Sequence, residues 1–226
     1  SDKLLDNYSD IFSRTNKVNN EVVFALRNDQ QENLKGGYYI YFYHPGNLIS
    51  SKYQNAPVPI SSTQWWSYSQ QFIDILEKSK NDNGDRRVDC NLGIGEYGAS
   101  GQTISWPNKF LGDMSKQPVV LDCDLLYYRY ALAVMMDAEL KYYKKDYAGA
   151  LKSLNLIAKR AYGKDNFYTE ANRDAVLSAL VNEYFLEFPA EGVIWWALIR
   201  LDKIWDYNPE LKAMQHTNKN ILLWPI

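Results

Sequence analysis

Aromatic side chains are the residues in this sequence whose types and spacing most readily suggest chemistry. The 226 residues include 18 Tyr and 7 Trp, and aromatic residues make up 15% of the chain. Tyrosine and tryptophan combine a flat apolar ring with a polar tip, so they can stack on the C–H face of a sugar while neighbouring groups bond its hydroxyls. The excess of these residues predicts a surface that binds a ligand by stacking.

The candidates for this platform lie in the first half of the chain. In residues 37–44, which we expect to form a strand, alternation places three tyrosines on one face. The adjacent Trp65 and Trp66 point about 100° apart on a helix, so at most one is readily buried. Ordinary packing remains the alternative for any single ring. The predicted ligand-binding set is Tyr39, Tyr41, Tyr43, His44, Tyr53, Trp65, Trp66, Tyr68 and Trp106.

Aromatic residues in the second half of the chain are interpreted differently, because they occur at helical spacing. We expect them to pack between helices, and we expect Trp224 beside Pro225 to anchor the end of the chain. The residues expected to pack are Tyr127, Tyr128, Tyr142, Tyr143, Trp195, Trp196 and Trp205.

Catalytic and metal-binding patterns are not recognisable. His44 and His216 are the two histidines and lie far apart in the sequence, which gives no basis for a metal site or a nucleophilic triad. Glu183 and Glu187 are one helical turn apart, and we expect them to serve helix packing and solvation. Glycoside hydrolysis would need two carboxyl groups held across a cleft, and nothing selects such a pair. The sequence therefore predicts a protein that is not an enzyme and needs no cofactor.

A glycine motif at residues 93–98 satisfies the G-x-G-x-x-G pattern of dinucleotide-binding proteins. That site needs a buried strand before the glycines and a helix after them. Here Arg86 and Arg87 stand shortly before the motif, and a glycine- and proline-containing segment follows it. We interpret the match as accidental and expect a flexible loop.

Charge and cysteine content restrict the class of protein further. The formal net charge is −2 and the pI is about 5.8, so no basic field is available for nucleic acid or for an anionic membrane surface. Cys90 and Cys123 stand alone in their segments, and two buried thiols are expected, although one long-range disulfide is conceivable. No apolar run is long enough to span a membrane, and we expect any export signal to lie upstream.

The elements that must position the aromatic residues follow from periodicity. We expect a hairpin of two strands at 21–27 and 37–44, and a helix from Ser62 or Thr63 to about Lys80, followed by a long loop at 81–118. Further helices are predicted at 122–144, 147–162, 172–188 and 195–206. The expected fold is one mainly α domain over 1–226, with strands and aromatic loops in 1–121 and a helical array in 122–226.

Several segments, in this order, resemble the SusD/RagB family of surface nutrient-binding lipoproteins from Bacteroidetes. Each is a partial match, and together they span nearly the whole chain. They are the Glu-Val-Val-Phe segment from Glu21, Asp85-Arg86-Arg87, the Arg-Tyr-Ala helix from Arg129 to Glu139, the helix from Ala150 to Arg160-Ala161, Asn182-Glu183 with Glu187 and Glu191-Gly192, and the final Leu-Trp-Pro-Ile. The family has charged residues at the positions of Tyr184, Ile194 and Ala197, so this sequence departs from the family pattern there. The family's charges resemble those of structural ion pairs between packed helices.

The resemblance implies a fold, a function and a location. It implies the C-terminal portion of a SusD-like α-α superhelix, and a longer protein with tetratricopeptide-like helices and a lipidated cysteine. It further implies non-catalytic capture of an oligosaccharide at the outer-membrane surface, for delivery to a SusC-like TonB-dependent transporter. Capture of oligopeptides, and a helical scaffold that only contacts other proteins, stay open as alternatives.

Overall fold

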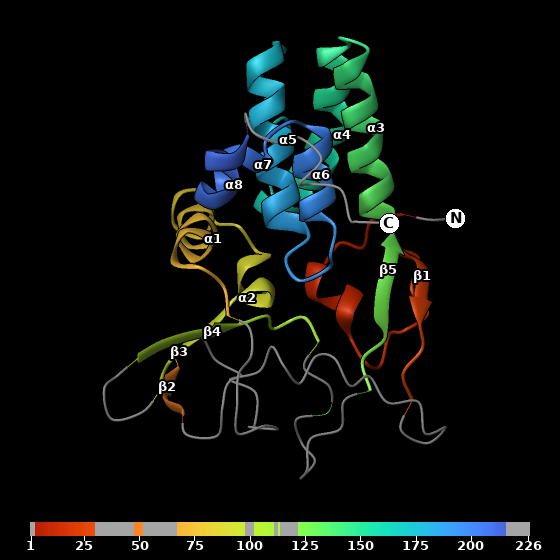
Figure 1. Cartoon of the computed structure of the whole chain (residues 1–226). Helices are drawn as coiled ribbons and strands as arrows, with labels where there is room; N and C mark the ends of the chain where they lie inside the picture. The colour runs from red at the N-terminus through yellow and green to blue at the C-terminus, as the bar shows by residue number, and fades with distance from the viewer. Residues whose placement is uncertain are drawn as a thin grey trace, which may run out of the picture.

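The computed structural model describes residues 3–29, 48–51, 67–97, 102–110, 113 and 122–215. Most of this part is helical, and two small antiparallel sheets lie at one end of the helices (Figure 1). The prediction of a mainly α fold with a small strand pair is confirmed. None of the described helices combines the length and apolarity that a membrane span requires.

Three long helices form the centre of the molecule. They are α3 (Tyr130–Tyr143), α4 (Tyr147–Tyr162) and α5 (Arg173–Glu187). The Asp146 side chain accepts a hydrogen bond from the Gly149 N–H at the start of α4, and Asn172 caps α5 in the same way. Because the link between α3 and α4 is short, the two helices pack as an antiparallel hairpin, as predicted.

The predicted helix at 122–144 is wrong at its beginning. Residues Leu125–Arg129 form strand β5, which runs directly into α3 (Figure 1). Strand β1 (Val22–Leu26) was predicted, and it pairs with β5 in an antiparallel, irregular register. The expected partner at residues 37–44 lies outside the described residues. Pairing across about 100 positions in the chain is a tertiary fact that local patterns do not contain.

The end of the described chain is a series of short helices. They are α6 (Ile194–Arg200), α7 (Ile204–Tyr207) and α8 (Pro209–Met214), in place of the single helix predicted at 195–206. The break falls at Asp202, whose φ of 53° is incompatible with a continuous right-handed helix.

Helix α1 (Gln70–Asn83) follows the cap Ser69, rather than beginning at Ser62 or Thr63, and ends at Gly84 in the left-handed conformation. Regular structure also occupies part of the segment at 81–118 that we expected to be a long loop. The short helix α2 (Val88–Asn91) and the strands β3 (Gly93–Tyr97) and β4 (Gln102–Trp106) follow. Together with β2 (Leu48–Ser51), these strands form a sheet of order β2-β3-β4.

The glycine motif therefore lies largely in a strand, and the expectation of a flexible loop is wrong. Gly93 pairs with Trp106 on β4, and a Cβ atom at position 93 would lie 2.1 Å from the Trp106 Nε1 atom. The glycine is needed because the indole occupies the space of a side chain. Packing against Trp106, and not phosphate binding, accounts for the glycine at position 93.

The main hydrophobic core lies between α3, α4, α5 and the short helices that follow, and it includes Trp205. A second core cluster joins α1 and α2 to α4 and α5, and a third joins the N-terminal 3-10 helix (Tyr8–Phe12) to β5. Cys90 and Cys123 form no disulfide, and burial raises the pKa of Cys90 to about 12, so it stays protonated.

Candidate functional site

Two of the nine predicted platform residues, Tyr68 and Trp106, belong to the described part of the chain. The other seven lie outside the described residues: Tyr39, Tyr41, Tyr43, His44, Tyr53, Trp65 and Trp66. Their role as a stacking surface stays a prediction.

Trp106 is a core residue and not part of an exposed platform. Its side chain is 1% exposed, it packs against Gly93, and its Nε1–H donates to the Asn108 Oδ1 atom at 2.9 Å. The prediction for Trp106 is wrong because the missing side chain at Gly93 leaves a slot on the neighbouring strand that the indole fills.

Tyr68 lies where the β-sheet meets helix α1. Its backbone N–H donates to the Ser105 Oγ atom at 2.9 Å, and its hydroxyl donates to the Asn91 carbonyl oxygen at 3.1 Å. Burial raises the pKa of this hydroxyl, so it remains a donor at all ordinary pH values. These bonds fix the ring at the edge of a groove.

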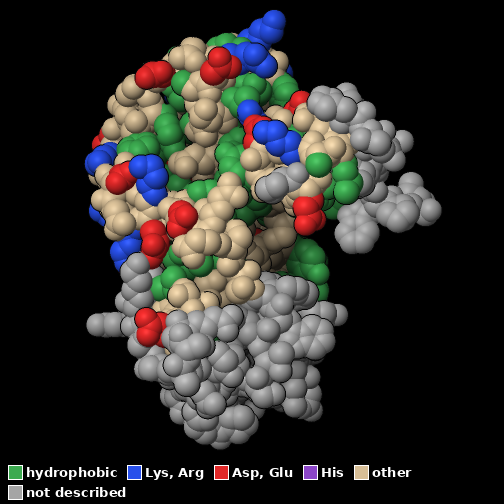
Figure 2. Space-filling view, turned by 60° about the vertical axis from the view of Figure 1, so that its left-hand side comes forward, with side chains coloured by type: hydrophobic (Ala, Val, Ile, Leu, Met, Phe, Trp, Pro, Cys, Tyr) green, Lys and Arg blue, Asp and Glu red, His purple; other side chains and the backbone are tan. Residues whose placement is uncertain are grey.

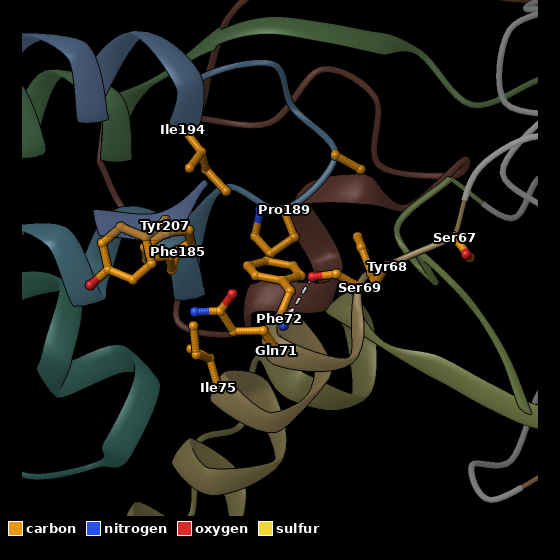
Figure 3. A pocket seen from close by; sticks show the side chains of 11 residues that line it. Ser67, Tyr68, Ser69, Gln71, Phe72, Ile75, Phe185, Pro189, Ile194 and Tyr207 are labelled. Carbon is orange, nitrogen blue, oxygen red and sulfur yellow. Dashed lines mark hydrogen bonds between the residues drawn. The ribbon is translucent and has the colours of Figure 1, made fainter. Parts of the chain in front are cut away.

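The groove begins beside the N-terminal end of α1 and has a volume of about 330 Å³. Rings from three elements line it: Tyr68 and Phe72 near the start of α1, Phe185 on α5 and Tyr207 on α7 (Figure 3). Successive ring centroids are 5.0 Å, 5.8 Å and 4.6 Å apart. Pro189, Ala190 and Ile194 also line it, so this half of the groove is largely apolar.

A second hollow of about 490 Å³ continues the groove along α1. It shares Gln71, Ile75, Phe185 and Tyr207 with the first, so the two form one elongated depression. Its polar lining consists of Gln71, Asp74, Lys78, Ser178, Asn182 and Lys203. One half thus offers ring faces, and the other offers donors and acceptors, which is the combination that binds a sugar or a peptide.

The second-half aromatics divide into packed and exposed residues. Trp205 is buried and Tyr142 is partly buried, as predicted. The expectation of packing is wrong for the others, since each is between 39% and 57% exposed: Tyr127, Tyr128, Tyr143, Trp195 and Trp196. Tyr127 and Tyr128 lie on β5 rather than on a helix, which removes the helical spacing on which the expectation rested.

A buried cluster of charged side chains lies on the other side of α5 from the groove. Glu183 and Glu187 project from α5, and both are completely buried. The Arg87 guanidinium donates to Glu183 at 2.6 Å and to Glu187 at 3.0 Å, while two further nitrogens hold Asp85 at 2.8 and 3.0 Å. The expectation that these two glutamates serve solvation is therefore wrong.

Arg129, at the end of β5, and Arg160, on α4, also belong to the cluster. Arg129 donates to Glu187 at 2.6 Å and to Glu191 at 2.7 Å, and both arginines bond Glu21. Arg160 also donates to Glu187. Although burial alone would raise the pKa of Glu187, the three surrounding guanidinium groups hold it well below its usual value.

Lys109 is the remaining cation of the cluster. Its ammonium donates to Glu191 at 2.5 Å and to the Glu187 carbonyl oxygen at 3.1 Å, and burial lowers its pKa to about 8. We define the buried charge cluster as these four cations and five carboxylates: Arg87, Lys109, Arg129, Arg160, Glu21, Asp85, Glu183, Glu187 and Glu191.

The buried charge cluster is a structural feature and not a catalytic site. Its carboxylates accept bonds from arginine and lysine in the interior, where a substrate has no access. Sequence reasoning did not recognise the cluster as a unit. The available signal was the occurrence of glutamate and arginine at positions such as Arg160 and Glu187, within otherwise apolar helix faces. Within the described ranges, no group of three or more potential metal ligands is assembled.

The fold and the groove define a mainly helical protein with an elongated, aromatic-lined depression on its surface. The model of the SusD family matches residues 93–222, which is more than half of the sequence. The chain belongs to the SusD family. Curated protein sequences contain no match to it.

Solved structures agree with this assignment at the level of the fold. A SusD superfamily protein of Bacteroides fragilis is 24% identical with a TM-score of 0.68, over 87% of this chain and 44% of that one. A SusD superfamily protein of Bacteroides vulgatus is 22% identical with a TM-score of 0.68, and the match covers 100% of this chain and 53% of that one. Surface glycan-binding protein A of Bacteroides thetaiotaomicron, in complex with laminarihexaose, is 20% identical with a TM-score of 0.60. The match covers 91% of this chain and 48% of that one. The chain spans about half the length of these proteins.

Proposed function

We propose that this chain binds an oligosaccharide without catalysing its conversion. SusD family membership supports the proposal, as does the structural similarity to surface glycan-binding protein A, a structure of which contains laminarihexaose. The observation that carries it in this chain is the groove beside α1, where four aromatic side chains adjoin a row of hydrogen-bonding groups.

The groove is close in the sequence to part of the predicted platform. Tyr68 lines the groove and follows Trp66 by two positions in the chain. We propose that Trp65, Trp66 and the tyrosines at 39, 41, 43 and 53, with His44, form the remaining stacking surface. An oligosaccharide would then lay its C–H faces on the rings and direct hydroxyls towards groups such as Asn182 and Gln71.

The absence of catalysis is part of the proposal. Carboxylates that approach one another in the buried charge cluster are engaged by arginines and face away from the groove. Asp74 is the one carboxylate among the described lining residues of the two hollows. A glycosidase of the ordinary kind needs two carboxyl groups beside the scissile bond.

Location and partner follow from the family. We propose that the protein acts at the outer-membrane surface, held there by a lipid anchor, and that it passes its ligand to a SusC-like TonB-dependent transporter. The family assignment supports both statements. No nucleic acid, metal or cofactor is part of the proposed function.

The test is calorimetric titration of the chain with a panel of oligosaccharides, including laminarihexaose, and with a pool of short peptides. We expect binding of at least one oligosaccharide, and weaker binding by Trp65→Ala and Trp66→Ala. A stacked ring contributes about 1 kcal/mol, so the loss for the stacking tryptophan is about fivefold or more. Product analysis after long incubation should show the oligosaccharide unchanged.

Each other outcome rejects a defined part of the proposal. Binding of peptides and of no oligosaccharide would reject the ligand class in favour of oligopeptide capture. Unchanged affinity in both tryptophan variants would reject the location of the platform. Release of shorter sugars would reject the non-catalytic role.

A further inference from the structure

The linker between α5 and α6 (residues 188–193) belongs both to the groove and to the buried charge cluster. Pro189 and Ala190 line the first hollow of the groove, and Pro189 is labelled among its side chains in Figure 3. The next residue, Glu191, places its carboxylate in the cluster. Three consecutive residues therefore join the surface that faces the ligand to the charged interior.

The linker makes a tight turn that its own residues only half favour. The Glu191 N–H donates to the Phe188 carbonyl oxygen at 3.2 Å, so Pro189 and Ala190 occupy the two central positions of the turn. Proline suits the first of these positions. Ala190, however, has a φ of 59°, in the left-handed region that favours glycine. Such a conformation persists where the surrounding structure holds it in place.

The backbone that enters the turn is held by side chains from distant segments. The Glu187 carbonyl oxygen accepts hydrogen bonds from Arg129 at 2.7 Å and from Lys109 at 3.1 Å. The Tyr8 hydroxyl is a third donor to the same oxygen. The Arg129 guanidinium also lies over the Phe188 ring, 4.3 Å from its centroid. These contacts fix the last residue of α5 and the first residue of the linker.

The residue that closes the turn is held by the same two cations. Lys109 donates to a Glu191 carboxylate oxygen at 2.5 Å, and Arg129 donates to both oxygens, at 2.7 and 3.1 Å. The three side chains are almost completely buried, where water competes little for these bonds. Lys109 and Arg129 thus bond the chain on both sides of Pro189 and Ala190.

We propose that Lys109 and Arg129 are positioning residues of the groove, which hold its α5–α6 wall in place from the interior. Neither side chain lines either hollow, so both act through the linker. The expected effect on ligand affinity rests on the proposed function, whereas the hold on the linker does not. The buried charge cluster then has a second role beside assembling the fold, because it sets the shape of one side of the binding site.

Lys109 also makes this hold sensitive to pH. Burial lowers the pKa of Lys109 to about 8, although the Glu191 carboxylate opposes the shift. Burial raises the pKa of both Tyr8 and Cys90, so these two groups keep their protons up to pH 9. The titratable and charged groups that face Lys109 come from the linker and four further elements: Tyr8, Cys90, Arg129, Glu187 and Glu191.

Arg129 keeps its charge in the same pH range. Burial alone would lower the pKa of Arg129, but Glu191 and Glu187 raise it well above its ordinary value. Between pH 7 and pH 9, Lys109 therefore loses its charge beside an arginine that stays charged. The ion pair between Lys109 and Glu191 is lost with it, which weakens one of the two holds on the linker.

Hydrogen exchange followed by mass spectrometry tests the hold on the linker without any ligand. Lys109→Met removes the ammonium but keeps a long side chain, and Glu191→Gln removes the partner charge. We expect amides within 188–193 to exchange about tenfold faster in both variants, because the turn opens more often. Leu151→Ala, in the main core near the end of α4 away from Arg160, controls for a general loss of stability and should leave these amides unchanged.

Two results of this measurement would overturn the proposal. One is unchanged exchange of the linker in the variants of Lys109 and Glu191. The other is an equal increase in Leu151→Ala, since the linker would then respond to stability in general. If Lys109→Met does not fold, Glu191→Gln decides, because it keeps all four cations of the cluster.

Calorimetric titration tests the effect on the groove, with laminarihexaose or the oligosaccharide of the panel that binds the wild type. We expect about three- to tenfold weaker binding by Lys109→Met and Glu191→Gln, because the ligand must order a wall that is no longer held. Leu151→Ala should bind like the wild type. Faster linker exchange with unchanged affinity would overturn the positioning role. A wild type that binds no oligosaccharide would reject the proposed function instead, and the exchange measurement would still decide whether Lys109 holds the linker.

The pH profile of binding separates positioning from a purely structural role. The affinity of the wild type should fall between pH 7 and pH 9, with a midpoint near the Lys109 pKa of about 8. The affinity of Lys109→Met should stay constant over this range, because the titrating group is absent. A constant wild-type affinity, or the same fall in Lys109→Met, would overturn the role assigned to the Lys109 charge.

Discussion

The two faces of helix α5 take part in opposite kinds of structure. One face carries Glu183 and Glu187 into the buried charge cluster, and the opposite face contributes Ser178, Asn182 and Phe185 to the groove. In the cluster, the two glutamates of α5 meet arginines from segments distant in the sequence, and solvent is excluded. The groove faces solvent, and most of its lining side chains are partly or fully exposed, although Val181 and Phe185 are buried.

This difference explains which residues carry the family resemblance. The matched segments Glu21, Asp85 to Arg87, Arg129, Arg160 and Glu183 to Glu191 each contribute at least one side chain to the buried charge cluster. The motifs therefore specify how the elements are assembled. Most groove residues lie outside these segments.

Figure 2 shows one face of the molecule. Among the described residues on this face, acidic and basic side chains are interspersed with hydrophobic ones, and no extended area carries charge of one sign.

The largest effect is expected from breaking the cluster. Arg129→Met removes a cation that bonds Glu21, Glu187 and Glu191, and leaves the five carboxylates of the cluster with three cations in the interior. Breaking a buried ion pair in this way costs about 3–5 kcal/mol. Urea unfolding should show this loss or an unfolded chain. Arg173→Met, on an exposed pair, should change stability by less than about 0.5 kcal/mol. Equal stability of the two variants would contradict a structural role for the cluster.

A smaller loss is expected from Gly93→Ala, which tests the sheet next to the groove. The new methyl group would meet the indole of Trp106 at 2.1 Å, and overpacking of this kind costs about 1–3 kcal/mol. Thermal unfolding followed by tryptophan fluorescence measures it. Gly192→Ala, where a Cβ atom meets nothing within 4 Å, controls for packing but retains the cost of a positive φ of 73°. If Gly93→Ala unfolds at the same temperature as the wild type, the packing of Trp106 against position 93 is not tight.

A change in the groove should affect binding but not folding. Gln71 is exposed and lines both hollows, so Gln71→Trp places a bulky ring across the groove. We expect about tenfold weaker binding of whichever oligosaccharide the wild type binds, or about 1.4 kcal/mol. Gln70→Trp, at the exposed neighbouring position outside the lining, is the matched control. Equal affinities of the two variants would place the ligand elsewhere.

The smallest effect is expected from mild acid. Glu187 has a pKa below its usual value of 4.5 in the folded state, so its stabilising contribution is complete above that pH. As the pH falls towards 4.5, the unfolded chain begins to take up a proton that the folded chain does not. Stability should therefore fall by about 0.4 kcal/mol from pH 7 to pH 4.5, and more steeply below. Urea midpoints measured across this range test it, and midpoints that rise on acidification would contradict the sign.

Local sequence patterns predicted the central helices well. Apolar periodicity indicated α4 and α5 closely, and the Val-Val-Phe run indicated β1. The patterns failed where neighbours in space decide the conformation. Residues 125–129 read as the start of a helix and form a strand because β1 provides a partner, and residues 93–97 read as a loop but form a strand between β2 and β4.

The candidate site could be predicted only in kind. Surplus tyrosine and tryptophan indicated a stacking surface, and Tyr68 does line a groove. Phe185 and Tyr207 were not foreseen as its lining, because α5, α6 and α7 bring them opposite α1 only in the folded chain. Trp106 was misjudged because its burial depends on the absence of a side chain on another strand.

The sequence by itself determined the helical class of the fold, the positions of its main helices and the family, since these depend on local periodicity and on residue types in order. The tertiary structure decided which aromatic rings are exposed and which charges are paired. Burial and pairing depend on contacts between distant segments, such as Glu21 with Arg160 across 139 positions and Tyr8 with the Glu187 carbonyl oxygen across 179. No local pattern contains those contacts, because each is formed only when the cores bring the segments together.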